Sequence, residues 1–227
     1  MKYTENHKLV DIIKDHYPLL PIISRFGIPS GFGDKTVRLV CKERDIDCPT
    51  FLAVLNYVAN GDMRGVGQVS VRAMVKFLRS SHEYYKTFYF SYLRERLKNA
   101  INYNTDNKLS VLIIKFFDSY TAEVIHHLQY EDDVMFKYVD ALTDGRRPAV
   151  PFDRLRHERQ HADIDSTLSE LINVIIKYYS DAGKANELNA VLFDIFSCDD
   201  DLKTHCRIED NLFIPAVTIL EKDSVQK

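Results

Sequence analysis

The sequence predicts an all-α protein, in which a small helical N-terminal domain precedes an up-down-up-down four-helix bundle. Two observations support this prediction. Four long segments in the second part of the chain keep apolar residues at alternating spacings of four and three over three or more turns. Such spacing is typical of helices packed in a bundle. Breaks containing asparagine, glycine or proline separate these segments, and short connections favour antiparallel neighbours.

The N-terminal domain is predicted at residues 1–62. Prolines and glycines divide this stretch into short apolar segments that indicate four helices. Pro21 can occupy the first turn of the second helix, and Gly27 should end it. Three closely spaced glycines then predict a linker at residues 63–69.

The bundle is predicted at residues 70–222. Its four apolar seams follow one another along the chain, at residues 71–89, 113–138, 157–178 and 188–212. Pro215 should end or kink the last helix near Ile214, because proline lacks the amide hydrogen that an interior helical position uses.

One motif occurs twice in the bundle. His-x-x-x-Glu-Asp is found at residues 127–132 and again at residues 205–210. Residues four apart share one face of a helix, about 6 Å apart along its axis. Each copy should therefore point one imidazole and one carboxylate the same way. A single such motif is common by chance, whereas two copies in register are a strong signal.

A histidine precedes each copy of the motif by a similar distance. The first lies 45 residues before the motif histidine and the second lies 44 residues before it. The repeat therefore comprises six side chains, which are His82, His127, Glu131, His161, His205 and Glu209. All six fall on the predicted buried seams, where such groups are costly unless they are paired or bound to metal.

These six side chains predict a metal site. Four imidazoles and two carboxylates form a ligand set that suits iron, manganese or zinc. Two half-sites indicate two metal ions, and each glutamate is placed to bridge them. The alternative is a set of hydrogen-bonded histidine–glutamate pairs in the core, without metal.

Two acids are candidate hydrogen-bond partners of the metal-binding histidines. Glu123 and Asp201 lie four residues before His127 and His205. A ligating imidazole usually donates its other N–H to a carboxylate or carbonyl. The alternative is that both acids are exposed on helix flanks. The aspartate after each glutamate, such as Asp132, also recurs, but an α-helix places it about 100° around the axis from that glutamate.

His157 and Tyr85 lie on the seams of His161 and His82. The repeat spacing favours His161 as the ligand, so we expect His157 beside the site. Tyr85 can line the metal cavity, and the alternative is that it only fills the core.

Composition and charge argue against several functions. The 227 residues are 45% hydrophobic and 28% charged with a formal net charge of -3, which gives no general attraction to nucleic acid or to a membrane surface. No apolar run approaches the roughly 18 residues of a membrane span, and the first residues lack the apolar core of a signal peptide. The four cysteines show no Cys-x-x-Cys spacing and indicate reduced thiols in a cytoplasm.

These residues resemble a known family. The bundle is similar to the hemerythrin-like (HHE cation-binding) domain, and more closely to the repair-of-iron-centres (RIC) di-iron proteins. In the bundle the resemblance rests on the six histidines and glutamates and on the closing run Asp210-Asn211-Leu212-Phe213-Ile214-Pro215. It extends to the N-terminal domain through Phe26-Gly27-Ile28 and the helix that leads to Asp45-Ile46-Asp47, and so covers nearly the whole chain.

The resemblance implies a cofactor and a role. The cofactor is a pair of iron ions, a non-haem di-iron centre with an oxo or hydroxo bridge, held by four histidines and two bridging glutamates. The role is cytoplasmic and belongs to the response to nitrosative or oxidative stress, either by repairing damaged iron–sulfur centres or by handling nitric oxide. The expected partners are O₂ or NO at iron and iron–sulfur proteins, with no nucleic acid and no membrane.

The sequence departs from the family in the N-terminal domain. The family carries Cys-Cys-Gly-Gly where this chain has Gly31-Phe32-Gly33-Asp34, so a role of that cysteine pair does not carry over. Two other functions therefore stay open. One is a module that binds or senses O₂ or NO without repair activity. The other is a di-iron oxidoreductase that turns over NO or peroxide.

Overall fold

The protein is all-α, as the sequence predicts. The computed structural model describes residues 2–146, 148, 154–180 and 182–225, and side chains at 154–160, 162–166, 182 and 223–225 are outside the description. The described residues contain no β-strand, and Lys8 and Thr36 form an isolated antiparallel bridge. The chain divides into two compact units, of which one comprises Met1–Ser81, Met135–Pro151 and His205–Lys227, and the other His82–Val134 and Phe152–Thr204. This division does not test the boundaries expected from sequence. The N-terminal domain at 1–62, the linker at 63–69 and the bundle at 70–222 therefore stay predictions.

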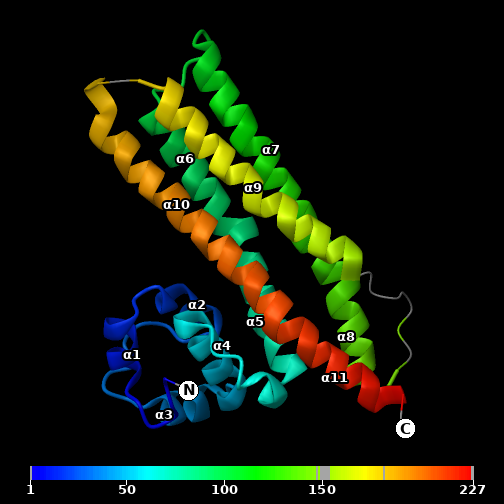
Figure 1. Ribbon diagram of the computed structural model, residues 1–227. Helices are drawn as coiled ribbons and strands as arrows, with labels where there is room; N and C mark the ends of the chain where they lie inside the picture. Colours follow the sequence, from blue (N-terminus) through cyan, green and yellow to red (C-terminus); the bar gives the residue numbers. More distant parts are fainter. Residues whose placement is uncertain (1, 147, 149–153, 181, 226–227) are drawn as a thin grey trace. The chain divides into compact units, whose positions relative to one another are not determined.

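Four short helices occupy the N-terminal part of the first unit (Figure 1). They are α1 (Leu9–Asp15), α2 (Leu19–Arg25), α3 (Val37–Arg44) and α4 (Cys48–Asn60). Thr36 and Asp47 cap the starts of α3 and α4, because their side chains accept hydrogen bonds from Leu39 N and Thr50 N. Gly27 and Gly61, with φ of 80° and 68°, let the chain leave α2 and α4 in the left-handed conformation.

The rest of the first unit consists of segments from farther along the chain. They are η1 (Val66–Gln68), the start of α5 (Val71–Tyr84), α8 (Phe136–Thr143), η5 (Glu209–Phe213) and α11 (Ile214–Val225). α8 packs against α11, and the Tyr138 hydroxyl donates a hydrogen bond of 2.6 Å to Glu221 Oε1. The rings of Phe136 and Phe213 meet edge to face at 5.8 Å.

The second unit is a four-helix bundle (Figure 1). Its segments are the end of α5 with η2 (Tyr85–Tyr89) and α6 (Phe90–Ala100), then α7 (Lys108–Tyr130) with η3 (Glu131–Met135) up to Val134, then α9 (Arg154–Tyr178), and then η4 (Ala182–Lys184) with α10 (Ala185–Ile208) up to Thr204. All four segments contribute buried apolar side chains to one core, among them Leu93, Phe117, Leu171 and Ile195. The predicted apolar seams therefore form the core of a bundle.

Three turns of the long helices are π-helical rather than α-helical. These are η2, η3 and η5, and each continues directly into an α-helix. π-helical turns are rare and often lie at functional sites. Pro215 does not end the last helix, because α11 runs from Ile214 to Val225, and the expected alternative, a kink near Ile214, stays a prediction. Pro215 instead lies in the first turn of the α-helix that follows the π turn, where a missing amide hydrogen is tolerated.

Among the described residues, no helix has both the length and the apolar content that a bilayer span requires.

Candidate metal centre

Three histidines converge on the carboxylate of Glu131 in the second unit. Nε2 of His127, one turn earlier on the same helix, lies 3.1 Å from Glu131 Oε1, and Nε2 of His82 from α5 lies 3.3 Å from Glu131 Oε2. Nε2 of His161 from α9 lies 3.6 Å from Glu131 Oε1. The rings of His127 and His161 meet edge to face with centroids 5.0 Å apart. Three different helical segments therefore supply imidazoles to one carboxylate.

This cluster is almost completely buried. The exposed fractions are 0% for His82 and Glu131, 2% for His127 and 4% for His161. Burying an ionised carboxylate is costly unless positive charge or hydrogen bonds compensate it. A metal cation bound by neutral imidazoles and the carboxylate would supply that charge. Burial at this level is what a protein-enclosed metal site requires.

The separations within the cluster fit ligands that share an ion. Two ligand atoms that each lie about 2.1 Å from one ion are about 3.0 Å apart at a right angle and about 3.4 Å apart at the tetrahedral angle. The three contacts of Glu131 fall between 3.1 and 3.6 Å. Ligand atoms of His127, Glu131 and His161 all lie within 4.8 Å of one another. The donor types and their spacing thus fit a metal ion.

Asp132 orients one of these imidazoles. Its Oδ1 lies 3.0 Å from His82 Nδ1, and its Oδ2 accepts a hydrogen bond of 2.6 Å from Lys86 Nζ. Burial opposes ionisation of Asp132, but the hydrogen bonds from His82 and Lys86 outweigh it and lower the pKa of this carboxyl group. With the proton on Nδ1, Nε2 is the nitrogen whose lone pair faces Glu131. A proton on Nδ1, donated to Asp132, would leave Nε2 of His82 available to bind a metal.

A second histidine–glutamate pair lies in the first unit. His205 is near the end of α10 and Glu209 begins the π turn η5. The exposed fractions of their side chains are 1% and 0%, and His205 Nε2 lies 3.5 Å from Glu209 Oε1. This pair repeats the relation between His127 and Glu131 one motif copy later.

The π turns extend the internal repeat from sequence into structure. Glu131 is the first residue of η3 (Glu131–Met135), and Glu209 is the first residue of η5 (Glu209–Phe213), so the two turns correspond residue for residue. η2 begins three residues after His82. The first turn opens with Glu131-Asp132 and the second with Glu209-Asp210. A π turn therefore follows or includes a predicted ligand at each of these three places.

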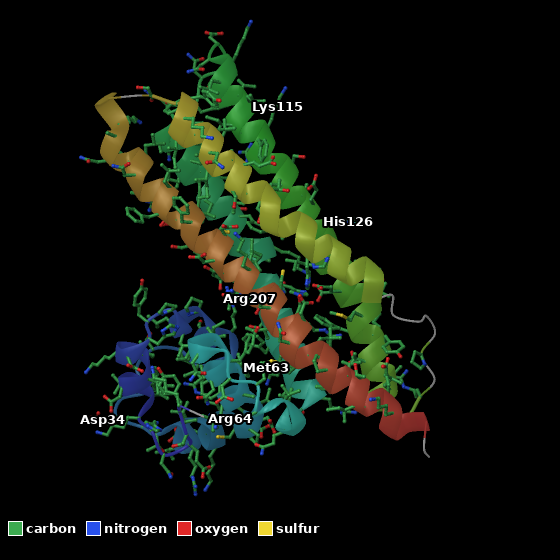
Figure 2. The ribbon with its side chains drawn as sticks, viewed as in Figure 1. Asp34, Met63, Arg64, Lys115, His126 and Arg207 are labelled. Atoms are coloured by element: carbon green, nitrogen blue, oxygen red, sulfur yellow. The ribbon has the colours of Figure 1, made fainter. Side chains whose placement is uncertain are left out.

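The remaining candidates lie as follows. Tyr85 is fully buried, and its hydroxyl donates a hydrogen bond of 2.7 Å to Asp201 Oδ2. Glu123 is exposed on α7 and forms no hydrogen bond to His127 in the described part of the chain. His126, which we did not choose as a ligand, is also exposed (Figure 2). His157 belongs to α9, and its side chain lies outside the described residues.

The role of Asp132 was missed from sequence, although a signal for it existed. An ideal α-helix places residue 132 about 100° from residue 131, which directs it away from the ligand face. The aspartate nevertheless recurs after the glutamate in both copies of the motif. That recurrence was the available signal. The π turn that begins at Glu131 departs from the regular α-helix on which the 100° argument was based.

Comparison with known protein families identifies the class of protein. Residues 73–217 match the Hemerythrin HHE cation binding domain. This match covers more than half of the chain, so the protein belongs to the hemerythrin HHE cation-binding family. Comparison with curated proteins and with solved structures gives no significant match. The family and the buried histidine–glutamate cluster together define a helical cation-binding protein whose cluster could hold a metal.

Proposed function

We propose that this protein is a non-haem di-iron protein of the RIC type, with one site built from both copies of the motif. As the resemblance to the RIC proteins implies, His82, His127, His161 and His205 would hold the two ions, and Glu131 and Glu209 would bridge them. The observation that carries the proposal is the convergence of three buried histidine Nε2 atoms on Glu131, at 3.1 to 3.6 Å. The matching helical position of the second pair supports it, since a π turn begins at both glutamates.

Iron is the metal that we propose, because the six ligands resemble those of the RIC di-iron proteins. The ligand set itself, imidazole and carboxylate without thiolate, suits iron, manganese or zinc. When bound, the two ions would supply Lewis acidity and a change of oxidation state to a small ligand such as O₂ or NO. The chain's own contribution is to hold the histidines in one tautomer through groups such as Asp132, and to exclude water by burial.

Metal analysis of three variants tests this site. The full chain expressed with iron should contain about two iron ions. Glu131→Gln and Glu209→Gln keep the shape of the side chain but remove its charge, so each should lose iron and the absorption of the centre. Glu123→Gln changes the same residue type at an exposed position of α7 and should keep both. Equal iron in Glu131→Gln and Glu123→Gln would refute the site.

We further propose that this centre serves the cytoplasmic response to nitrosative or oxidative stress by repairing damaged iron–sulfur centres or by handling nitric oxide. This part rests on the resemblance of the six ligands and the closing run to RIC proteins. The test is recovery of an iron–sulfur enzyme that nitric oxide has inactivated. Parent protein should restore its activity and Glu131→Gln should not. Equal recovery with both proteins would refute a repair role for the centre.

A second candidate is a module that binds or senses O₂ or NO without repair. It is favoured by one observation, the loop Gly31-Phe32-Gly33-Asp34, which contains no cysteine. This candidate predicts a reversible spectral change on adding and removing NO, with no recovery of the damaged enzyme. Repeated consumption of NO or peroxide with a supplied reductant would instead indicate an oxidoreductase.

A further inference from the structure

A cavity of about 580 Å³ lies within the first unit, next to the N-terminus of α5. Its volume falls in the range of small-molecule sites. The end of α2, the α3–α4 connection and the first turns of α5 line it, and the charged lining residues are Arg25, Arg44, Arg72, Lys76, Asp45 and Asp47. Four cations and two carboxylates line it, a formal excess of two positive charges, and one of these cations, Arg72, pairs with Asp144 outside the lining.

Of the two acids of the cavity, Asp47 is engaged with the backbone. The Asp47 side chain caps α4 by accepting a hydrogen bond of 2.9 Å from Thr50 N. Asp45 closes α3 in the left-handed conformation, with φ of 53°. Both are exposed. Neither carboxylate forms an ion pair with the four cations in the described part of the chain.

The four cations that line the cavity differ in exposure and in ion pairing. Arg25 is only 6% exposed, although it ends a surface helix. Arg72 forms an ion pair with Asp144. Arg44 and Lys76 are exposed, and neither forms an ion pair with any described residue. Positive charge on the walls of a concave site concentrates anions there, and guanidinium groups match the oxygens of phosphate and carboxylate.

One wall of the cavity is aromatic. Phe26 and Phe77 both line it, and their rings stack with centroids 4.5 Å apart and an interplanar angle of 23°. Phe51 packs against this pair, since its ring meets that of Phe26 edge to face with centroids 4.9 Å apart. Phe77 is only 2% exposed whereas Phe26 is half-buried, so Phe26 leaves the apolar surface that a flat group could cover. The lining therefore combines an anion-binding part with an apolar part.

We propose that this cavity binds a small organic anion, with a phosphate or carboxylate group at Arg44 and Lys76 and a flat apolar body against Phe26. The site is independent of the proposed metal centre, because none of the six candidate metal ligands lines it.

Calorimetric titration of the full chain with phenyl phosphate tests the proposal. Phenol carries the same ring without the anion, inorganic phosphate carries the anion without the ring, and benzoate replaces phosphate by carboxylate. Phenyl phosphate should bind more tightly than phenol or inorganic phosphate. Comparison with benzoate then shows which anion the site prefers. Equal binding of phenol and phenyl phosphate would overturn the proposal, as would no binding of phenyl phosphate and benzoate at about 10 mM, near the weak limit of specific affinity.

Two double variants, each lacking two positive charges, test whether phenyl phosphate binds in this cavity. The double variant Arg44→Ala/Lys76→Ala should weaken phenyl phosphate binding about tenfold, because it removes two charged hydrogen-bond donors. The matched control, Lys42→Ala/Lys115→Ala, removes the same net charge at exposed positions that do not line the cavity. Metal content should be unchanged in both. Equal affinity in the two double variants would overturn the assignment.

Discussion

Nδ1 of His82 lies 3.0 Å from Oδ1 of Asp132, a residue fifty positions later in the chain. This contact joins α5 to the π turn η3 and fixes the ring of a buried histidine. Lys86 Nζ lies 2.6 Å from the other oxygen of Asp132, so the carboxylate that orients His82 is itself held. The helix that carries the histidine also carries the lysine that positions its partner.

Asp132→Asn should weaken metal binding about 10- to 100-fold, because the hydrogen-bond partners of metal-bound histidines contribute at this level. The variant keeps the size of the side chain, so the fold should be unchanged by circular dichroism. Competition with a chelator of known affinity measures the loss.

Asp133→Asn is the matched control for this variant. Asp133 is the next residue in the same π turn, and it is exposed and accepts a hydrogen bond of 2.6 Å from Gln129. Metal affinity should stay at the parent value in this control. If the two variants lose affinity equally, the contact of Asp132 with His82 does not support the site.

The long apolar seams allowed the bundle to be predicted from sequence. Spacings of four and three over several turns report burial directly, and the buried residues Phe117 and Leu171 lie on those seams. The histidine–glutamate spacing likewise placed His127 and Glu131 on one face, 3.1 Å apart. These features depend only on regular helical geometry, which sequence spacing expresses.

Two kinds of feature could not be predicted from the sequence. They are local departures from regular α-helical geometry and contacts between residues far apart in the chain. Asp132 reaches His82 from a π turn, whose wider spacing the α-helical pattern does not contain. Asn56 bonds to Tyr3 across 53 residues. The cavity beside Arg25 arises where separate short helices meet. No spacing within one segment encodes such contacts.

Leu171→Ala should destabilise the bundle by about 2–5 kcal/mol, as expected for removing a large apolar side chain from a packed core. Leu171 is fully buried on α9. Urea unfolding followed by circular dichroism measures the change. Ile176→Ala on the same helix is the control, because Ile176 is 57% exposed, and its effect should stay within about 0.5 kcal/mol. A similar loss in both variants would show that the seam is assigned incorrectly.

Asn56→Ala should loosen the N-terminal helices. The buried Asn56 side chain accepts a hydrogen bond of 2.7 Å from Tyr3 N and donates bonds of 2.9 Å to Tyr3 O and Leu52 O. Loss of these partners leaves buried backbone groups unsatisfied, at a cost of about 1–3 kcal/mol. Hydrogen exchange of the α4 amides should accelerate accordingly. The exposed Asn99→Ala on α6 should leave α4 exchange unchanged, and parent-like α4 exchange in Asn56→Ala would contradict this account.

Stability should fall as the solution becomes alkaline, in part through Cys41. Burial raises the pKa of the Cys41 thiol in the folded protein above its ordinary value. The unfolded chain therefore releases this proton first, near pH 8.5, while the folded protein keeps it. The folded state then binds more protons than the unfolded state, so the free energy of unfolding decreases with rising pH above that value. One such group contributes a slope of at most about 1.4 kcal/mol per pH unit.

Cys41→Ala isolates this contribution. The variant lacks the titrating thiol, so its free energy of unfolding should fall less steeply than that of the parent between pH 8.5 and 9.5. Below pH 8 the two slopes should coincide, because the thiol is protonated in both states there. The measurement is urea unfolding under reducing conditions at closely spaced pH values. Parallel pH profiles across the whole range would show that Cys41 does not titrate differently in the two states, and hence that its burial does not govern its chemistry.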